Sequence, residues 1–527
     1  MTTLQFSSAP ALETIELFDQ PPALERGRPR PRVPEPLLRA DEGVRAPAAR
    51  TPIAILGVPF DNVTSADTLR IIGEMIASGR PHYAATANVD FVVQALEDVE
   101  LRRILGDADL VLCDGMPLVW ASRFLGNPLP ERVTGSDLVP KLLGEAERNG
   151  WRVFFLGGTD ESVARAAKNA QALHPQLQLV GAYSPPFKSL LEMDHDDIVR
   201  RVREAKPDVL LVAFGCPKQE KWINMQFKQA GVPLSIGVGA TLDFLAGSVR
   251  RAPVWMQRTG LEWIFRLLQE PRRLFRRYVT DLWVFGRAIL WQWWQLRGLR
   301  DQSRRANRVI AQAPRTGDSQ LVRFAERLDA ATVSEHQELW AGLVASEAHV
   351  LLDVSGVKFI DSTGVGLLVR LQKKLRAGRR QLVLVAPTKP VQRALALMRI
   401  AEFFPTSCHL TAARDLIRER VSEQNVVATL NLAGPQEPLA WQGDITAANE
   451  AAIWRLTKVH LEISRVRKTA INVNLAGVRF LDSTGVRLMV RVRKEASQRG
   501  VKLSFTEPPP VVQNVLRILR MEQYLLN

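Results

Sequence analysis

Short apolar segments that end in glycine or a polar residue alternate with amphipathic helical segments between residues 53 and 243. Leu110–Cys113 ends at Asp114-Gly115, and Val209–Phe214 ends at Gly215. This alternation predicts a parallel α/β sheet. Because the carboxyl ends of parallel strands lie at one edge, where open α/β sheets bind ligands, we expect the polar residues after the strands to gather there.

Asp114 is the first candidate for a reacting group in this pattern. It directly follows a strand that reads as buried, so the sheet should deliver its carboxylate to the ligand-binding edge. The alternative is that Asp114 caps the helix expected to begin near Leu118. The residues of this stretch leave both interpretations open.

Length and cysteine usage set limits on the whole chain. A chain of 527 residues exceeds one hydrophobic core, so we expect about two to four domains. The three cysteines are scattered and lack metal-ligand spacing, which favours a reducing compartment over a disulfide framework and offers no zinc site. The first residues show no signal-peptide pattern, and we therefore expect a protein that stays in the cytoplasm.

The formal charge of +15 is concentrated in one segment. Residues 250–308 hold fourteen arginines against four acidic residues, together with six of the twelve tryptophans. Arginine mixed with tryptophan and leucine is typical of a helix lying in an anionic membrane interface. A spanning helix is disfavoured, because Asp281, Arg287 and Arg297 interrupt the apolar run. Nucleic acid is the other partner of basic segments, but the tryptophan content favours lipid, so we expect no nucleic acid.

Two short motifs resemble a metal site and a dinucleotide-binding site, but their local sequence context does not support either function. Asp194 and Asp196 form the D-x-D that metal-dependent glycosyltransferases use, but they precede a helix at Ile198–Ala205. Capping of that helix explains them, so we predict no metal site. Gly157-Gly158 is half of a dinucleotide fingerprint without the rest, which does not support a nicotinamide cofactor. We expect no cofactor.

The strand ends carry a family resemblance. From about Ile53 to about Tyr278 the chain resembles the WecG/TagA/CpsF glycosyltransferases in the order and spacing of its motifs, which are HYAATANVD, ADLVLCDGMPLVW, RVTGSDLV, VFFLGG, VAFGCPKQEKW, GVGATLDFLAG, RRAP and GLEWIFRLLQEPRRLFRRY. The resemblance implies transfer of a sugar from a UDP donor to an undecaprenyl-diphosphate-linked saccharide at the inner face of the cytoplasmic membrane. It further implies inversion at the anomeric carbon and no essential metal, with mannosaminyl donors the best known.

The resemblance also implies roles for residues at the sheet edge. Asp114 matches the family position of the base, which takes the acceptor's proton in an inverting transfer. Thr86 and Gln219 match polar positions that orient the sugars or the diphosphate. Strand-end capping is the alternative for both side chains. Further candidates for substrate binding are Asn88, which lies beside Thr86, Asp243, which matches a family residue near the nucleotide, and Arg132.

Arginines in the basic segment are the remaining candidates. Arg266, Arg273 and Arg276 match family positions in a membrane-docking appendage that meets the acceptor's diphosphate, and guanidinium groups bind phosphate in bidentate fashion. On an uninterrupted helix these three would lie within an arc of about 80°, although Pro271 breaks that helix or opens the next. The alternative is a solvated basic face. We assign the flanking Arg272 and Arg277 to bulk lipid.

An internal repeat occupies the C-terminal part. VKFIDSTGV at 357–365 recurs as VRFLDSTGV at 478–486, each copy between two predicted strands and before a helix. The repeats resemble two STAS domains, the anti-sigma-factor-antagonist fold. In that family the residue matching Thr363 or Thr484 can be phosphorylated by a partner kinase. A phosphate there would sit at a helix N-terminus and repel the preceding aspartate. The alternatives are a binding role without phosphorylation, or capping alone.

The sequence therefore predicts a Rossmann-like α/β glycosyltransferase domain, a helical basic appendage and two small STAS α/β domains. The expected boundaries are 1–50 disordered, 51–250 transferase core, 251–298 appendage, 299–317 linker, 318–422 first STAS domain and 423–527 second STAS domain.

The predicted function is peripheral, membrane-associated sugar transfer in surface polysaccharide assembly, with a donor of N-acetylmannosamine, uronic-acid or glucose type. The alternative is a STAS-based regulatory scaffold with a degenerate enzyme domain. Expected partners are the UDP-sugar, the polyprenyl-diphosphate acceptor and an anionic membrane. A kinase or biosynthetic enzyme that binds the STAS domains, and self-association, are left open.

Overall fold

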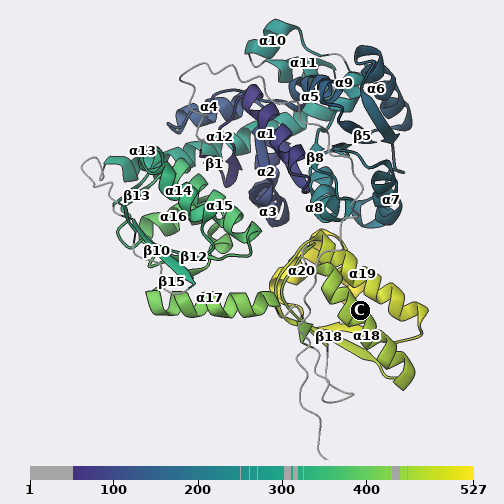
Figure 1. Cartoon of the computed structure of the whole chain (residues 1–527), viewed down its shortest axis with the longest axis vertical. Coiled ribbons are helices and arrows are strands. Elements are labelled where there is room, and N and C mark those ends of the chain that lie inside the picture. The colour runs from purple at the N-terminus through teal and green to yellow at the C-terminus, as the bar shows by residue number, and fades with distance from the viewer. Residues whose placement is uncertain are drawn as a thin grey trace, which may run out of the picture. The chain divides into compact units, whose positions relative to one another are not determined.

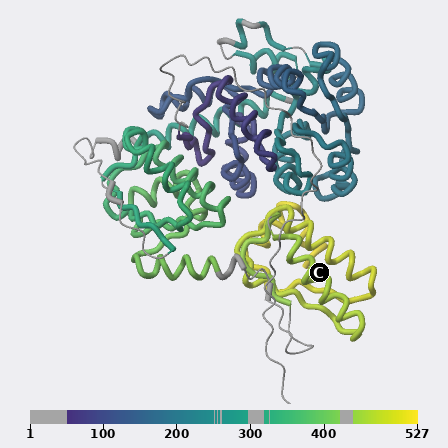
Figure 2. The backbone as a smooth tube through the Cα atoms, viewed as in Figure 1, coloured from purple at the N-terminus to yellow at the C-terminus, as the bar shows by residue number. Residues whose placement is uncertain are grey.

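The computed structural model describes residues 51–249, 251–259, 261–269, 271–301, 310–312, 318–324, 326–425, 428–429, 439–447 and 449–526. The segment 1–50, expected to be disordered, lies outside these residues, as do 302–309 and 313–317 of the expected linker. Figure 1 labels the helices and strands, and Figure 2 follows the backbone from the N-terminus to the C-terminus.

The N-terminal part forms a parallel sheet, as predicted. Within the described residues it has six strands in the order β4-β3-β8-β7-β5-β6, and every neighbouring pair is parallel. The elements of this part are β1 (Ile53–Ile55), β2 (Val58–Phe60), α1 (Ser65–Ala77), β3 (His82–Ala87), α2 (Val89–Glu97), α3 (Val99–Asp107), β4 (Leu110–Cys113), α4 (Met116–Phe124), α5 (Gly135–Asn149), β5 (Arg152–Gly157), α6 (Asp160–Leu173), β6 (Gln178–Tyr183), η1 (Leu190–Glu192), α7 (His195–Ala205), β7 (Val209–Ala213), α8 (Lys218–Ala230), β8 (Leu234–Gly237) and α9 (Thr241–Leu245).

Both faces of this sheet are buried, and alternate residues of each strand enter different cores. In β7, Leu210 and Val212 belong to the core on one face, whereas Val209 and Leu211 belong to the core on the other. Burial on both faces explains why the strands read as unbroken apolar runs rather than as alternating ones. Most polar residues of this sheet therefore lie at or beyond the strand ends.

The start of the described chain differs from the prediction. Ile53–Val58 reads as one strand, but the structure has a hairpin in which β1 pairs antiparallel with β2. Leu56 and Gly57 both have positive φ, at 49° and 90°. Two consecutive residues with positive φ make the tight turn that reverses the chain between paired strands.

Helices α10 (Val254–Thr259), α11 (Glu262–Gln269) and α12 (Pro271–Asp301) follow the sheet domain and form the appendage. The inner face of α12 is buried, and Phe285 and Ile289 join the core that also contains strand and helix residues of the sheet domain. Among the described residues, none of the helices combines the length and the apolar character needed to span a bilayer.

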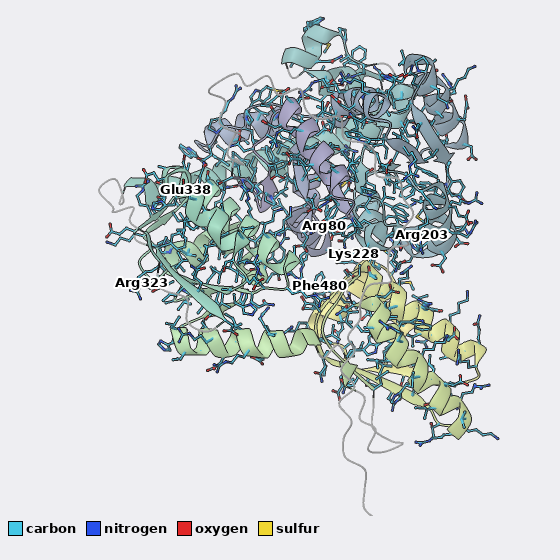
Figure 3. The ribbon with its side chains drawn as sticks, viewed as in Figure 1. Arg80, Arg203, Lys228, Arg323, Glu338 and Phe480 are labelled. Atoms are coloured by element: carbon cyan, nitrogen blue, oxygen red, sulfur yellow. The ribbon has the colours of Figure 1, made fainter. Side chains whose placement is uncertain are left out.

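The C-terminal part contains two further α/β units. The first has the sheet β15-β14-β12-β10-β9 and the pair β11-β13, and the second has the sheet β16-β17-β18-β19. Side chains of both units are drawn in Figure 3, where Arg323 and Glu338 mark the first and Phe480 the second. Strand β9 lies inside the stretch expected to be a linker, and it pairs antiparallel with β10.

The elements of the first unit are β9 (Ile310–Gln312), β10 (Ser319–Phe324), β11 (Arg327–Leu328), α13 (Ala330–Glu335), α14 (Gln337–Ala345), β12 (His349–Asp353), β13 (Phe359–Ile360), α15 (Ser362–Ala377), β14 (Leu382–Val385), α16 (Lys389–Leu397), η2 (Ala401–Phe403), β15 (Thr406–Ser407) and α17 (Leu410–Asn425). Those of the second are β16 (Ala428–Thr429), β17 (Leu439–Ile445), α18 (Glu450–Arg467), β18 (Ile471–Leu481), α19 (Ser483–Gln498), β19 (Leu503–Thr506), α20 (Pro510–Ile518) and α21 (Glu522–Leu526).

Candidate active site

Asp114 stands at the carboxyl end of β4 and does not cap the helix that follows. Helix α4 begins at Met116, and the residue before it, Gly115, occupies the capping position. The carboxylate of Asp114 is directed to the start of α5, where Oδ2 accepts a hydrogen bond of 3.2 Å from the backbone N–H of Gly135. The capping alternative for Asp114 is therefore wrong.

The surroundings of Asp114 raise its pKa to about 6. Burial is the largest cause, because it disfavours the charged carboxylate. The Gly135 N–H and the positive charges of Arg266 and Arg132 act in the opposite direction, and the negative charge of Glu262 adds to the rise. A carboxyl group with a pKa near 6 is suited to exchange a proton close to neutral pH.

Arg132 joins a network of alternating charges next to Asp114. Its guanidinium lies 3.2 Å from Asp137 and 3.3 Å from Glu262, and Arg251 lies 2.6 Å from Asp137 and 3.8 Å from Glu262. Since Glu262 belongs to α11, the network fastens the appendage to the sheet edge. A pocket of about 290 Å³ lies beside it and is lined by Arg132, Asp137 and Arg251 among others.

Thr86 and Gln219 form hydrogen bonds that hold strand ends together, as the strand-end capping alternative predicts for both side chains. The hydroxyl of Thr86 donates to the carbonyl of Gly237 at the end of β8, at 2.9 Å. The side-chain oxygen of Gln219 accepts from the backbone N–H groups of Gly215 and Gly239, at 3.2 and 3.1 Å. Gln219 therefore ties together the loops after β7 and β8, which shapes the edge where Asp114 lies.

Glu220 is a buried acid that sequence reasoning missed. Its Oε1 accepts a hydrogen bond of 2.7 Å from the amide nitrogen of Gln219. Burial raises the pKa of Glu220 to about 8, which the hydrogen bond from Gln219 partly offsets. Glu220 lies within the quoted motif VAFGCPKQEKW, but a residue's burial is not visible in the motif itself.

Asn88 and Asp243 also have structural partners. Asn88 caps α2 through a hydrogen bond of 3.3 Å from the N–H of Phe91. Asp243 accepts a hydrogen bond of 2.5 Å from the hydroxyl of Ser162, near the start of α6. Because α6 follows the Gly157-Gly158 loop of β5, Asp243 lies beside a helix N-terminus at the same edge of the sheet.

The appendage arginines lie on separate helices. Arg266 is in α11, whereas Arg273 and Arg276 are in α12, which Pro271 opens, so the uninterrupted-helix arc does not apply. Arg266 stacks over the ring of Phe244 at 4.7 Å and lines a pocket of about 100 Å³ together with Asp243. Arg276 is exposed, and the side chain of Arg273 is not among those that the structure describes.

Arg277, assigned from the sequence to bulk lipid, makes ion pairs within the protein. Its guanidinium lies 3.6 Å from Asp90 of α2 and 3.8 Å from Asp281. Burial and the nearby charge of Asp90 raise the pKa of Asp281 to about 6, against the influence of Arg277. Arg277 therefore links α12 to the sheet domain, while Arg272 is exposed.

The D-x-D motif has the capping role that was predicted. Asp194 caps α7 by accepting a hydrogen bond of 3.0 Å from the N–H of Asp197, and Asp197 pairs with Arg200 and Arg201. Across the part of the chain that the structure describes, no group of three or more histidine, cysteine, aspartate or glutamate side chains is arranged to hold a metal ion.

The repeated Asp-Ser-Thr-Gly segments begin helices α15 and α19. Asp361 accepts from the N–H groups of Thr363 and Gly364, at 2.8 and 2.9 Å, and Asp482 accepts from Gly485 at 3.0 Å. Thr363 and Thr484 therefore occupy the first turn of a helix, as expected, but both are buried.

Comparison with known proteins assigns each part of the chain. Residues 53–299 match the glycosyl transferase WecG/TagA/CpsF family, residues 311–413 match the STAS domain, and residues 429–527 match the Mlab-type STAS domain. The N-acetylglucosaminyldiphosphoundecaprenol N-acetyl-beta-D-mannosaminyltransferase of Staphylococcus aureus is 31% identical over 44% of this chain and 91% of its own length. The chain belongs to the WecG/TagA/CpsF glycosyltransferase family.

This glycosyltransferase has further relatives of the same kind. The Bacillus spizizenii protein of the same name is 31% identical over 39% of this chain and 80% of its own length. Among solved structures, unphosphorylated anti-sigma factor antagonist SpoIIAA is 18% identical, and an antagonist from Mycobacterium paratuberculosis is 23% identical. Each covers 21% of this chain and 97% of its own, with a TM-score of 0.20.

Sequence reasoning also missed the partners of the glycosyltransferase's site arginines. Glu262 lies in the motif GLEWIFRLLQEPRRLFRRY, Asp137 in RVTGSDLV and Arg251 in RRAP. These motifs contain the charged residues, but the sequence does not show which of them pair, because more than a hundred residues separate Arg132 from Glu262. Only folding determines which acid meets which base.

Proposed function

We propose that this glycosyltransferase transfers an N-acetylmannosamine-type sugar from a UDP donor to an undecaprenyl-diphosphate-linked saccharide, with inversion and at a membrane surface. The observation that carries the proposal is the position of Asp114 at the sheet edge, where its carboxyl group has a pKa of about 6. The positive charge of Arg266, an arginine of the appendage, lowers this pKa and so favours the carboxylate form. The activities for which the relatives are named support this acceptor and this sugar.

Asp114 acts as the general base in this proposal. The acceptor hydroxyl oxygen attacks the anomeric carbon while its proton passes to the Asp114 carboxylate. The bond between the anomeric carbon and the UDP oxygen breaks, and UDP leaves with the bonding electron pair. Negative charge grows on the departing diphosphate, so nearby cations and N–H groups stabilise the transition state.

In this proposal, arginines stabilise the phosphate groups of both the donor and the acceptor. Arg266 lines the pocket that contains Asp243, and Arg132 lies beside Asp114. Arg273 and Arg276, in the first and second turns of α12, bind the acceptor's diphosphate as it enters from the membrane. Thr86 and Gln219 act by fixing the strand ends, and Asn88 by fixing the start of α2, so their contributions are to the shape of the site.

The outer face of the appendage supports membrane binding. Ten large apolar side chains stand exposed on the described residues of α10, α11 and α12, and Trp283 keeps 73% of its surface exposed. Exposed apolar patches mark interaction surfaces, and tryptophan and arginine together suit the headgroup region of an anionic bilayer. These side chains are Trp255, Trp263, Leu268, Phe275, Val279, Leu282, Trp283, Leu290, Trp291 and Trp294. The protein would then act as a peripheral enzyme on the cytoplasmic face.

A donor panel tests the proposed reaction. The purified full chain is incubated with individual UDP-sugars and N-acetylglucosaminyl-diphospho-lipid, and sugar transfer is followed by mass spectrometry. We expect transfer from UDP-N-acetylmannosamine, loss with Asp114→Asn, and retention with the exposed control Asp196→Asn. No transfer from any donor would favour the alternative, a STAS-based regulatory scaffold with a degenerate enzyme domain.

A further inference from the structure

Helix α3 of the sheet domain carries charged side chains that are buried. Glu100 is 8% exposed and Arg102 is 3% exposed, although they belong to a short helix at the surface of the sheet domain. Charged side chains are almost never buried unless they are paired. Their partners lie both in the sheet domain and in the two STAS domains.

Glu100 holds the first residue of α19 in the second STAS domain. Its Oε1 accepts from the backbone N–H of Ser483 and its Oε2 from the Ser483 hydroxyl, each at 2.7 Å. Lys221 of α8 lies 2.9 Å from the same carboxylate. A carboxylate at a helix N-terminus is stabilised by the helix dipole and by free N–H groups, the same features that bind phosphate.

Arg103 adds a second contact from the same side of α3. It lies one turn after Glu100, so the two side chains are neighbours on the helix surface. Its guanidinium lies 2.8 Å from Asp444 and stacks over the ring of Phe480, with 3.8 Å to the ring centroid. Phe480 and Ser483 flank the Asp482 cap, so both contacts fall on the Asp-Ser-Thr-Gly segment and its approach.

The first STAS domain meets α3 and the hairpin before it. Arg102 donates to the carbonyl of Arg399 at 2.5 Å, and Lys373 donates to the carbonyl of Ala108 just after the helix. A Cβ at Gly366 of α15 would lie 1.9 Å from the Pro52 carbonyl oxygen. Glycine is therefore required at this position for the two backbones to approach.

A buried amide completes the contact with the first domain. Gln292 of α12 accepts from the N–H of Leu56 at 3.1 Å and donates to the hydroxyl of Ser362 at 3.2 Å. Ser362 and Ser483 are equivalent residues of the repeat, the first of their helices. Both Asp-Ser-Thr-Gly segments therefore contact the transferase portion, through different residues.

We propose that the helix starts at Ser362 and Ser483 are intramolecular docking sites, and that the partner of both STAS domains is the transferase of their own chain. Helix α3 is the common contact, with Glu100 and Arg103 holding the second domain and Arg102 the first. This proposal does not depend on the sugar that is transferred. An external partner or a kinase reaches these segments only when the domains separate.

A charge swap across the interface tests this docking. Arg103→Glu places a carboxylate against Asp444, and the double variant Arg103→Glu with Asp444→Arg restores an opposite pair. Arg80→Glu is the matched control because Arg80 is exposed in the same sheet domain. Hydrogen–deuterium exchange of the full chain is measured over 99–107 and 480–486.

We expect Arg103→Glu to increase exchange several-fold in both segments together, the double variant to return it toward the original rate, and Arg80→Glu to leave it unchanged. Equal exchange in Arg103→Glu and Arg80→Glu would overturn the proposal, as would failure of the double variant to restore protection. If Arg103→Glu exchanges rapidly throughout the chain, Phe480→Leu decides by the same measurement, since it removes the ring under Arg103 without adding charge.

Discussion

The carboxylate of Asp114 accepts a hydrogen bond from the backbone N–H of Gly135, across 3.2 Å and between the end of β4 and the start of α5. This contact draws Asp114 away from its own helix α4 and holds it over the sheet edge. Arg132, three residues before Gly135, and Arg266 of the appendage both favour the charged form of Asp114. A carboxylate held in this way is oriented by the fold before any substrate arrives.

The pH dependence of transfer should follow Asp114. Below its pKa of about 6 the carboxyl group is protonated and cannot accept the acceptor's proton, so kcat/KM should rise with pH and level off above about 7. Asp114→Asn should lower kcat by about 10²- to 10⁴-fold and remove this rise. Steady-state rates between pH 4.5 and 8.5 measure both effects. A full rate in Asp114→Asn would contradict the assignment of the base.

Neighbouring charges should move that pH profile in opposite directions. Arg266 lowers the pKa of Asp114, so Arg266→Gln should shift the midpoint of the rise to higher pH. Glu262 raises the pKa, so Glu262→Gln should shift the midpoint to lower pH. The midpoint is informative even where the rate falls, and Arg165→Gln, at an exposed ion pair on α6, serves as the control. Shifts in the same direction for both variants would refute this electrostatic account.

Membrane binding should depend on the outer face of α12. Trp283→Ser combined with Trp291→Ser should weaken binding to anionic vesicles at least about a hundredfold, because burying each large apolar side chain contributes about 1.5–3 kcal/mol. Trp120→Ser is the matched control, since Trp120 is exposed but lies on α4. Vesicle co-sedimentation with phosphatidylglycerol measures the affinity. Equal losses for the control and the double variant would show that α12 has no special role.

Glycine at position 366 should be required despite its cost in a helix. Gly→Ala in an exposed helix interior stabilises by about 0.5–1 kcal/mol, and Gly342→Ala on α14, with open space around it, should do so. Gly366→Ala should instead lower the melting temperature, because its methyl group would collide with the Pro52 carbonyl. Thermal unfolding followed by circular dichroism compares the variants. A higher melting temperature for Gly366→Ala would mean that Pro52 is not held against α15.

Much of the fold could be predicted from strand ends and from the repeat. Apolar runs buried on both faces must end where polar residues begin, so the positions of Asp114, Gly215 and Gly239 at one edge followed from the pattern. The hairpin at Leu56-Gly57 could not be predicted in this way. Its two strands read as one apolar run, and the turn between them is visible only in the positive φ values of Leu56 and Gly57. Likewise, the pairing of Arg277 with Asp90 depends on how α12 packs on α2.

The candidate site was predicted less completely than the fold. Asp114 and Arg132 were both identified as candidates, but Glu262 and Glu220 were not, since nothing local distinguishes a buried acid from an exposed one. Gln219 was expected to orient substrate, whereas its contacts are to backbone N–H groups after two strands. An amide side chain has the same sequence signal in either role.

The sequence by itself determined which segments become strands, where each strand ends, and that the Asp-Ser-Thr-Gly segments start helices, because periodicity and capping act over a few residues. Only the tertiary structure decided that Asp114 turns to Gly135, that Arg132 meets Glu262, and that Glu100 meets Ser483, a residue 383 positions later. Such pairs form because buried charges and free N–H groups must find partners, and which partners come within reach depends on how the helices pack.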